Sequence, residues 1–69
     1  MNIKELGTTI RKRRKELSID QKSLAEMAEV SVHTLSDIES GKANPTIEIL
    51  DKILQVLGLE LRVDLRRSP

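Results

Sequence analysis

The chain has 69 residues and a net charge of +1, which indicates one small domain and excludes a uniformly basic coat for nucleic acid. It has no Cys and a single His, so we expect no disulfide, no metal site and no cofactor. The absence of Phe, Tyr and Trp argues against binding single strands or RNA by base stacking.

An apolar stripe at helical spacing begins near the N-terminus and predicts a first helix running to about residue 17. The stripe consists of Ile3, Leu6, Ile10 and Leu17. Arg14 lies on the same stripe, so its guanidinium is expected to turn inward, where it needs a partner. The other members of the basic run at residues 11–15 lie at different angles and are expected to be solvated.

Two short helices are predicted next. Asp20 is a suitable N-cap for a helix from Gln21 to about residue 28, and Ser31 for another from Val32 to about Glu39. Their inward residues are Leu24, Ala25 and Ala28 in the first and Leu35 and Ile38 in the second. Two short helices joined by so tight a turn are typical of a helix-turn-helix, in which the second helix faces a partner.

Gly41 and Pro45 end the third helix, and Thr46 caps a fourth that Gly58 closes. Its inward residues are Ile47, Leu50, Ile53, Leu54 and Leu57. Ile49 and Val56 widen this apolar surface beyond the needs of one small core.

Apolar and charged residues alternate from residue 59 to residue 66, which predicts a half-buried strand. A lone strand has no partner within the chain, so we expect it to pair with the same strand of a second copy; a frayed tail is the alternative. The predicted dimer interface comprises Ile49, Val56, Leu59, Leu61, Val63 and Leu65.

The order of motifs between residues 6 and 61 resembles the Xre-type helix-turn-helix family of phage repressors and Cro proteins. The matching residues are Gln21, Leu24-Ala25, Val30-Ser31, Ile38-Glu39, Gly41 and Asn44-Pro45. The resemblance implies an all-α, lambda-repressor-like bundle of four to five helices that binds duplex DNA as a dimer. We therefore expect a DNA-binding domain over residues 1–58 and a dimerisation strand and tail over residues 59–69.

Two features depart from the family pattern. Glu29 stands in the turn where the family usually has Gly, and a left-handed conformation there costs a non-Gly residue about 1 kcal/mol. The alternating C-terminal segment, with its Arg66-Arg67 tail, replaces a fifth helix. This ending is similar to that of the HipB-like antitoxins, small repressors encoded with a HipA-type kinase toxin.

The resemblance also implies roles for individual residues, including an internal, structural ion pair between Arg14 and Glu39. By position on the third helix, the base-reading candidates are Val32, His33, Thr34, Ser36 and Asp37. The phosphate-binding positions of the family match Gln21, Ser31, Ser40, Gly41, Lys42 and Asn44. Arg11 and Lys12 either extend this set or belong to a solvated basic face.

These features predict a dimeric, sequence-specific repressor of an inverted-repeat operator, acting as the antitoxin of a HipA-type operon that represses its own promoter and binds the toxin. The alternative is a protein-interaction module with the same fold and little DNA binding. An enzyme is not predicted, because the Ser, His and Asp side chains of the third helix lack a pocket and oxyanion donors. With no apolar run of ~20 residues and no apolar block in the first ten residues, we expect a cytoplasmic protein.

Overall fold

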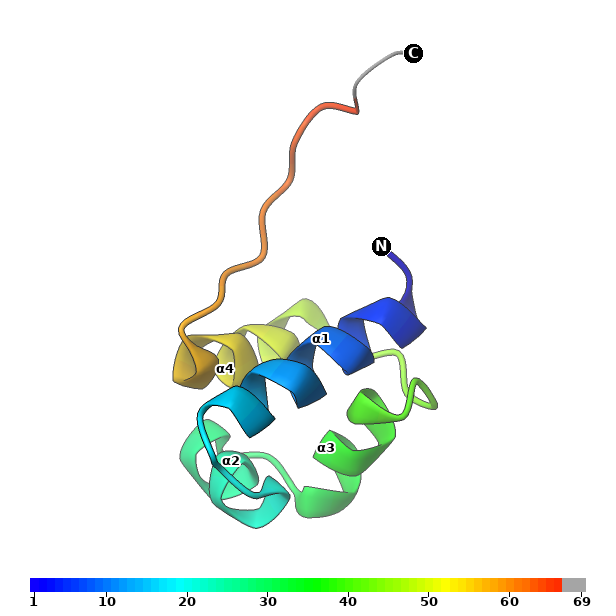
Figure 1. Ribbon diagram of the computed structural model, residues 1–69. Helices are drawn as coiled ribbons and strands as arrows, with labels where there is room; N and C mark the ends of the chain where they lie inside the picture. The colour runs from blue at the N-terminus through cyan, green and yellow to red at the C-terminus, as the bar shows by residue number, and fades with distance from the viewer. Residues whose placement is uncertain (67–69) are drawn as a thin grey trace.

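The computed structural model describes residues 1–66, in which four helices surround one apolar core (Figure 1). The helices are α1 (Ile3–Glu16), α2 (Gln21–Ala28), α3 (Val32–Glu39) and α4 (Ile47–Leu57). The all-α, helix-turn-helix class predicted from the sequence is confirmed. Within the described part of the chain, every helix is too short or too polar to cross a bilayer.

Each helix begins directly after a polar residue whose side chain accepts a hydrogen bond from an amide of the first turn. Asp20, Ser31 and Thr46 accept from the amides three residues further on, at 2.7, 3.0 and 3.2 Å, as predicted. Asn2 caps α1 in the same way at 2.8 Å. The helix starts follow from local chemistry, because each cap needs only a short side chain at the right position.

The core is formed by one side of every helix, with α1 packed against α3 and α4, and α2 packed against the same two helices. Its buried apolar residues are Ile10, Leu24, Ala25, Ala28, Leu35, Ile38, Leu50, Ile53, Leu54 and Leu57. Three residues that the periodicity placed inward are exposed instead, namely Ile3, Leu17 and Ile47. All three lie at or just beyond a helix end, outside the buried core cluster.

Gly7 marks the closest approach of α1 to α3. A Cβ atom on this residue would overlap the backbone carbonyl oxygen of Ile38 and lie 2.8 Å from that of Glu39. Only a residue without a side chain therefore allows α1 to rest on the end of α3. The local sequence around Gly7 does not reveal this role, because the contact is with a helix end more than thirty residues away.

The predicted C-terminal strand is wrong for the described residues. Residues 59–66 form no strand, and from residue 60 they run away from the bundle as an extended segment (Figure 1). Leu59 instead completes the end of α4, where its amide donates to the carbonyl of Leu54 at 2.9 Å. The segment has no adjacent strand within residues 1–66 to supply ladder hydrogen bonds, so alternation alone does not make a sheet. Arg67 of the predicted tail lies outside the described residues.

Candidate nucleic-acid interface

The turn between α2 and α3 sets the angle at which α3 meets the rest of the molecule. Glu29 adopts the left-handed conformation, with φ of 58° and ψ of 41°, at the position where the family usually has Gly. The next amide, that of Val30, donates to the carbonyl of Ala25 at 3.0 Å and closes the end of α2. Ser31 then caps α3, so the two helices are separated by only three residues.

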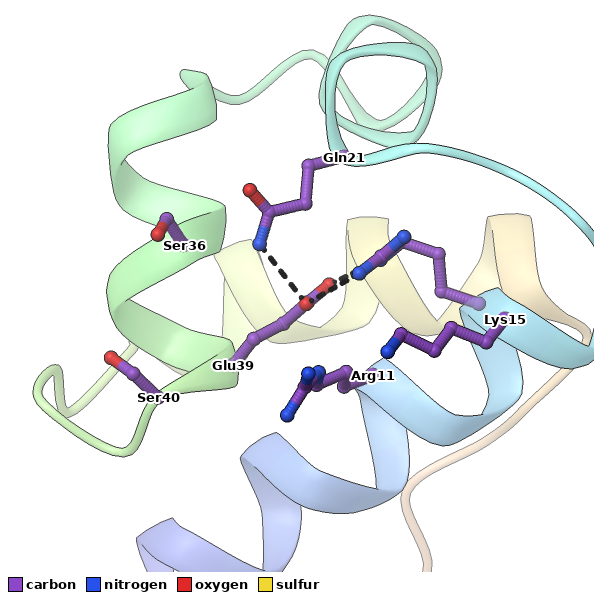
Figure 2. Close-up of a pocket in the computed structure, with 7 residues that line it drawn as sticks. Arg11, Lys15, Gln21, Ser36, Glu39 and Ser40 are labelled. Atoms are coloured by element: carbon purple, nitrogen blue, oxygen red, sulfur yellow. Dashed lines mark hydrogen bonds and ion pairs between the residues drawn. The ribbon is translucent and has the colours of Figure 1, made fainter.

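A buried ion pair joins α1 to the end of α3, and Figure 2 shows it at the centre of a polar network. Arg14 donates from Nε and Nη2 to the two carboxylate oxygens of Glu39, at 2.7 and 3.0 Å. Both residues are less than 9% exposed. The hydrogen bond to Glu39 outweighs burial and raises the pKa of Arg14 above its ordinary value. The pairing implied by the resemblance is therefore present in the structure.

The same carboxylate also orients the first residue of α2. Gln21 donates from its amide nitrogen to Glu39 at 3.1 Å, and Arg14 donates from Nη1 to the carbonyl of Ile19 at 2.8 Å. The network thus connects α1, the α1–α2 turn, α2 and α3 through one charged centre. Among the described residues, no buried side-chain nitrogen or oxygen lacks a hydrogen-bond partner, so burial of these charges is fully compensated.

The outer face of α3 carries most of the predicted base-reading residues. Val32 and His33 are exposed, while Ser36 and Asp37 are half-buried. His33 Nε2 lies 3.3 Å from Asp37 Oδ2, so the two side chains form one polar unit one turn apart. Thr34 differs from the others, because its hydroxyl accepts a hydrogen bond from Ser31 at 2.8 Å and is committed to the cap.

The predicted phosphate contacts lie around both ends of α3. The loop that follows this helix is folded around the carbonyl of Asp37, which accepts from the amides of Lys42 and Ala43 at 2.9 and 3.2 Å and from the Ser40 hydroxyl at 3.2 Å. Gly41 permits this turn with a φ of 79°. The side chains of Lys42 and Asn44 stay exposed on the loop.

An open pocket lies between α1, α2 and the end of α3, with a volume of about 330 Å³ (Figure 2). Its lining consists of Arg11, Arg14, Lys15, Gln21, Ser36, Glu39 and Ser40. Arg11 was predicted only as one of two possible additions to the phosphate-binding set, and Lys15 was not predicted individually. Their spacing of four residues, on either side of the inward Arg14, is the signal that could have found them.

The basic run at residues 11–15 serves different purposes on different sides of α1. Arg13 donates from Nε to the carbonyl of Leu57 at 2.9 Å and so caps the C-terminus of α4. The prediction that all members other than Arg14 are solvated is therefore wrong for Arg13. Lys12 is exposed and does not line the pocket.

The predicted dimer residues divide into two groups. Ile49, Val56 and Leu59 pack partly against the core of their own chain. Leu61, Val63 and Leu65 are exposed on the C-terminal segment. Residues 1–66 hold no cluster of three His or acidic side chains arranged to bind a metal ion.

The geometry defines a helix-turn-helix domain in which α3, the second helix of the motif, is uncovered on its outer face. Comparisons with known proteins agree. The family model described as "Helix-turn-helix" matches residues 10–63. The chain belongs to this family, which is the Xre/Cro-like group expected from the sequence and is one of transcription regulators rather than enzymes.

Individual relatives support this assignment. The chain is 38% identical over 55 residues to an uncharacterized HTH-type transcriptional regulator of Methanothermobacter thermautotrophicus, covering 80% of each. It is 39% identical over 57 residues to the putative multi-protein-binding factor 1 of Yarrowia lipolytica, covering 83% of this chain but only 38% of that longer protein. In structure it is similar to the clp gene regulator ClgR of Corynebacterium glutamicum, with a TM-score of 0.78, 30% identity and coverage of 81% and 60%.

Proposed function

We propose that the chain is a sequence-specific, duplex-DNA-binding repressor that places α3 in the major groove. One observation carries this proposal: the outer face of α3 is uncovered, while Leu35 and Ile38 fix its inner face to the bundle. A helix held in this way can enter a groove of about 12 Å width without rearranging the core.

The chemistry of the exposed face suggests how bases would be read. Val32 can pack on a thymine methyl group, and Ser36 can donate or accept. Asp37 can accept a hydrogen bond from cytosine N4, and His33 can donate one to a guanine or a phosphate. In the free protein, however, these two side chains contact each other. Binding therefore requires the pair to separate or to be read as a unit.

The surrounding groups would set the register of α3 on the backbone. Gln21 at the start of α2, Ser31 at the start of α3, and Lys42 and Asn44 in the following loop lie on both sides of the reading face. Helix N-termini and exposed amides bind phosphates, so these groups would position the protein while carrying no sequence information.

We further propose that two copies bind an inverted repeat, with their α3 helices one DNA turn, ~34 Å, apart. The exposed apolar residues of the C-terminal segment, with Val63 at 98% and Leu65 at 92%, favour contact with another protein surface. In sedimentation experiments, Val63→Asp and Leu65→Asp together should shift a dimer toward monomer. A dimer that tolerates both changes would place the interface elsewhere.

The same exposed residues favour a second candidate role, that of an antitoxin whose C-terminal segment binds a HipA-type kinase toxin. The two roles are compatible, since an antitoxin of this kind represses its own promoter. Co-expression with a kinase encoded by a neighbouring gene tests the second role. We expect the two wild-type proteins to co-purify and the combined Val63→Asp and Leu65→Asp changes to abolish this. If the wild-type proteins purify independently of each other, the antitoxin role is refuted.

The DNA-binding proposal is tested by selecting duplexes from a randomised pool and measuring affinity across a salt series. His33→Ala and Asp37→Ala should change the preferred sequence, whereas Lys42→Ala should weaken all duplexes by a similar factor. Lys52→Ala, an exposed lysine on α4, is the matched control and should leave binding unchanged. A wild-type chain without measurable duplex affinity at low salt would favour the alternative, a protein-interaction module that does not read DNA.

A further inference from the structure

We propose that the pocket between α1, α2 and α3 holds one phosphate of the DNA backbone, clamped by Arg11 and Lys15. This inference rests on the proposed function and adds α1 to the DNA-binding surface. Figure 2 shows both side chains extending from the same side of α1 into the space in front of Glu39. Neither has a carboxylate within 4.0 Å among residues 1–66, so both charges are available to an anion.

The charge balance of the pocket favours an anion despite the glutamate in its lining. Three cations and one carboxylate line it, giving 3 − 1 = +2. The carboxylate oxygens of Glu39 already accept three hydrogen bonds, two from Arg14 and one from Gln21. Its charge is therefore compensated inside the protein, and the two outer cations remain in excess.

The pocket also offers neutral donors beside these cations. The side-chain amide of Gln21 has two N–H groups and gives one to Glu39, which leaves the second for a ligand. Gln21 is the first residue of α2, so the positive end of that helix adds to the field. Ser36 and Ser40 contribute hydroxyls from the side of α3.

The residues that line the pocket favour a phosphate of the DNA backbone over a buried small molecule as the ligand. Pockets for small molecules are lined mainly by apolar side chains and enclose most of the ligand. This one is open, and every residue of its lining is polar or charged. Ser36 belongs both to this lining and to the reading face, so a phosphate bound here would border the groove that α3 enters.

Charge-removing variants within the basic run test the proposal. Arg11→Gln, Lys15→Gln and the double variant are compared with Lys52→Gln, which removes an exposed charge from α4, outside the pocket. Circular dichroism verifies that each variant is folded. Affinity for the selected duplex is measured across a salt series, in which each neutralised phosphate contributes about 0.9 to the slope of log K against log salt.

If Arg11 and Lys15 share one phosphate, each single variant weakens binding, and the double variant loses about one unit of slope in total. Lys52→Gln keeps the wild-type slope. Pocket variants that also keep the wild-type slope overturn the inference and leave the proposed function intact. A loss of about two units, additive over the singles, overturns the shared phosphate. A wild-type chain that binds no duplex overturns both.

Titration of the DNA-free protein with inorganic phosphate tests whether the pocket binds a DNA phosphate or a free phosphate ion. The expected result is that the Gln21 side-chain amide resonances show no saturable shift at millimolar phosphate, because a single free anion gains none of the neighbouring backbone contacts. A saturable shift in the wild type that Arg11→Gln abolishes would instead identify a site for a free phosphate and overturn the assignment to DNA.

Discussion

Helices α3 and α4 are held in the same bundle by different forces. Helix α4 buries Leu50, Ile53, Leu54 and Leu57, so the hydrophobic effect fixes it along its length. Helix α3 buries two apolar residues and adds a carboxylate that Arg14 and Gln21 hold in place. The difference shows how a polar helix can be positioned firmly: one buried charge network replaces apolar contacts and leaves the opposite face free for a ligand.

The largest expected effect comes from removing the charge network at α3. Glu39→Ala leaves Arg14 buried without its partner and should lower the free energy of unfolding by about 3–5 kcal/mol. A chain of this length has only about 3–10 kcal/mol in total, so urea denaturation followed by circular dichroism should find the unfolding midpoint of the variant at a much lower urea concentration than that of the wild type.

A companion double variant separates the cost of losing the ion pair from the cost of leaving one charge buried and unpaired. Arg14→Met combined with Glu39→Leu replaces the pair by apolar side chains and should stay folded, with a stability near that of the wild type. A Glu39→Ala variant that loses less than about 1 kcal/mol would mean that the network does not hold α3.

The corresponding test for α4 is truncation of a fully buried side chain. Ile53→Ala removes apolar contacts at the centre of the core and should cost about 2–5 kcal/mol in chemical denaturation. Ile47→Ala on the same helix is the control, because this side chain is 73% exposed and its loss should change stability by less than about 0.5 kcal/mol. Equal effects of the two changes would contradict the assignment of the core face of α4.

The contact between α1 and the end of α3 predicts an intermediate effect. Gly7→Ala improves helix propensity by up to about 1 kcal/mol, but its Cβ overlaps the carbonyl of Ile38 and forces the helices apart. We expect a net loss of about 1–2 kcal/mol in thermal or urea unfolding. Thr8→Ala, at the next and exposed position, should be neutral or stabilising; if Gly7→Ala is also stabilising, the helices are not in close contact there.

The smallest expected effect concerns the turn that leads into α3. The left-handed conformation costs a non-Gly residue about 1 kcal/mol, and Glu29→Gly removes this strain. Gly also gives the unfolded chain more conformational freedom, which offsets part of the gain, so the net stabilisation should be about 0.5 kcal/mol. Glu26→Gly, inside α2, should destabilise by a similar amount or more. Opposite signs in matched thermal melts support the assigned conformation, and equal signs contradict it.

Sequence reasoning predicted the helices well because their signals are local. Asp20, Ser31 and Thr46 were identified as caps from one residue each, and the breaks at Gly41 and Gly58 needed only the adjacent sequence. It failed at the C-terminal segment for the opposite reason. A strand requires a neighbour to complete its hydrogen bonds, and alternation over residues 59–66 contains no information about whether one exists.

The candidate site was predicted in part. The uncovered face of α3 follows from the tight turn and from the sparse apolar residues Leu35 and Ile38, and the inward direction of Arg14 follows from helical spacing. The pocket beside it was missed, because it forms only where residues of α1, α2 and α3 converge after folding.

By itself, the sequence determined where each helix starts and stops and which face of α3 stays polar, because caps, turns and periodicity act within a few residues along the chain. Tertiary structure alone decided how the basic run is divided: Arg13 caps α4, Arg14 pairs with Glu39, and Arg11 and Lys15 line the pocket. In the sequence, the five adjacent cations are nearly equivalent. Their roles differ only because three other helices bring different groups to each side of α1.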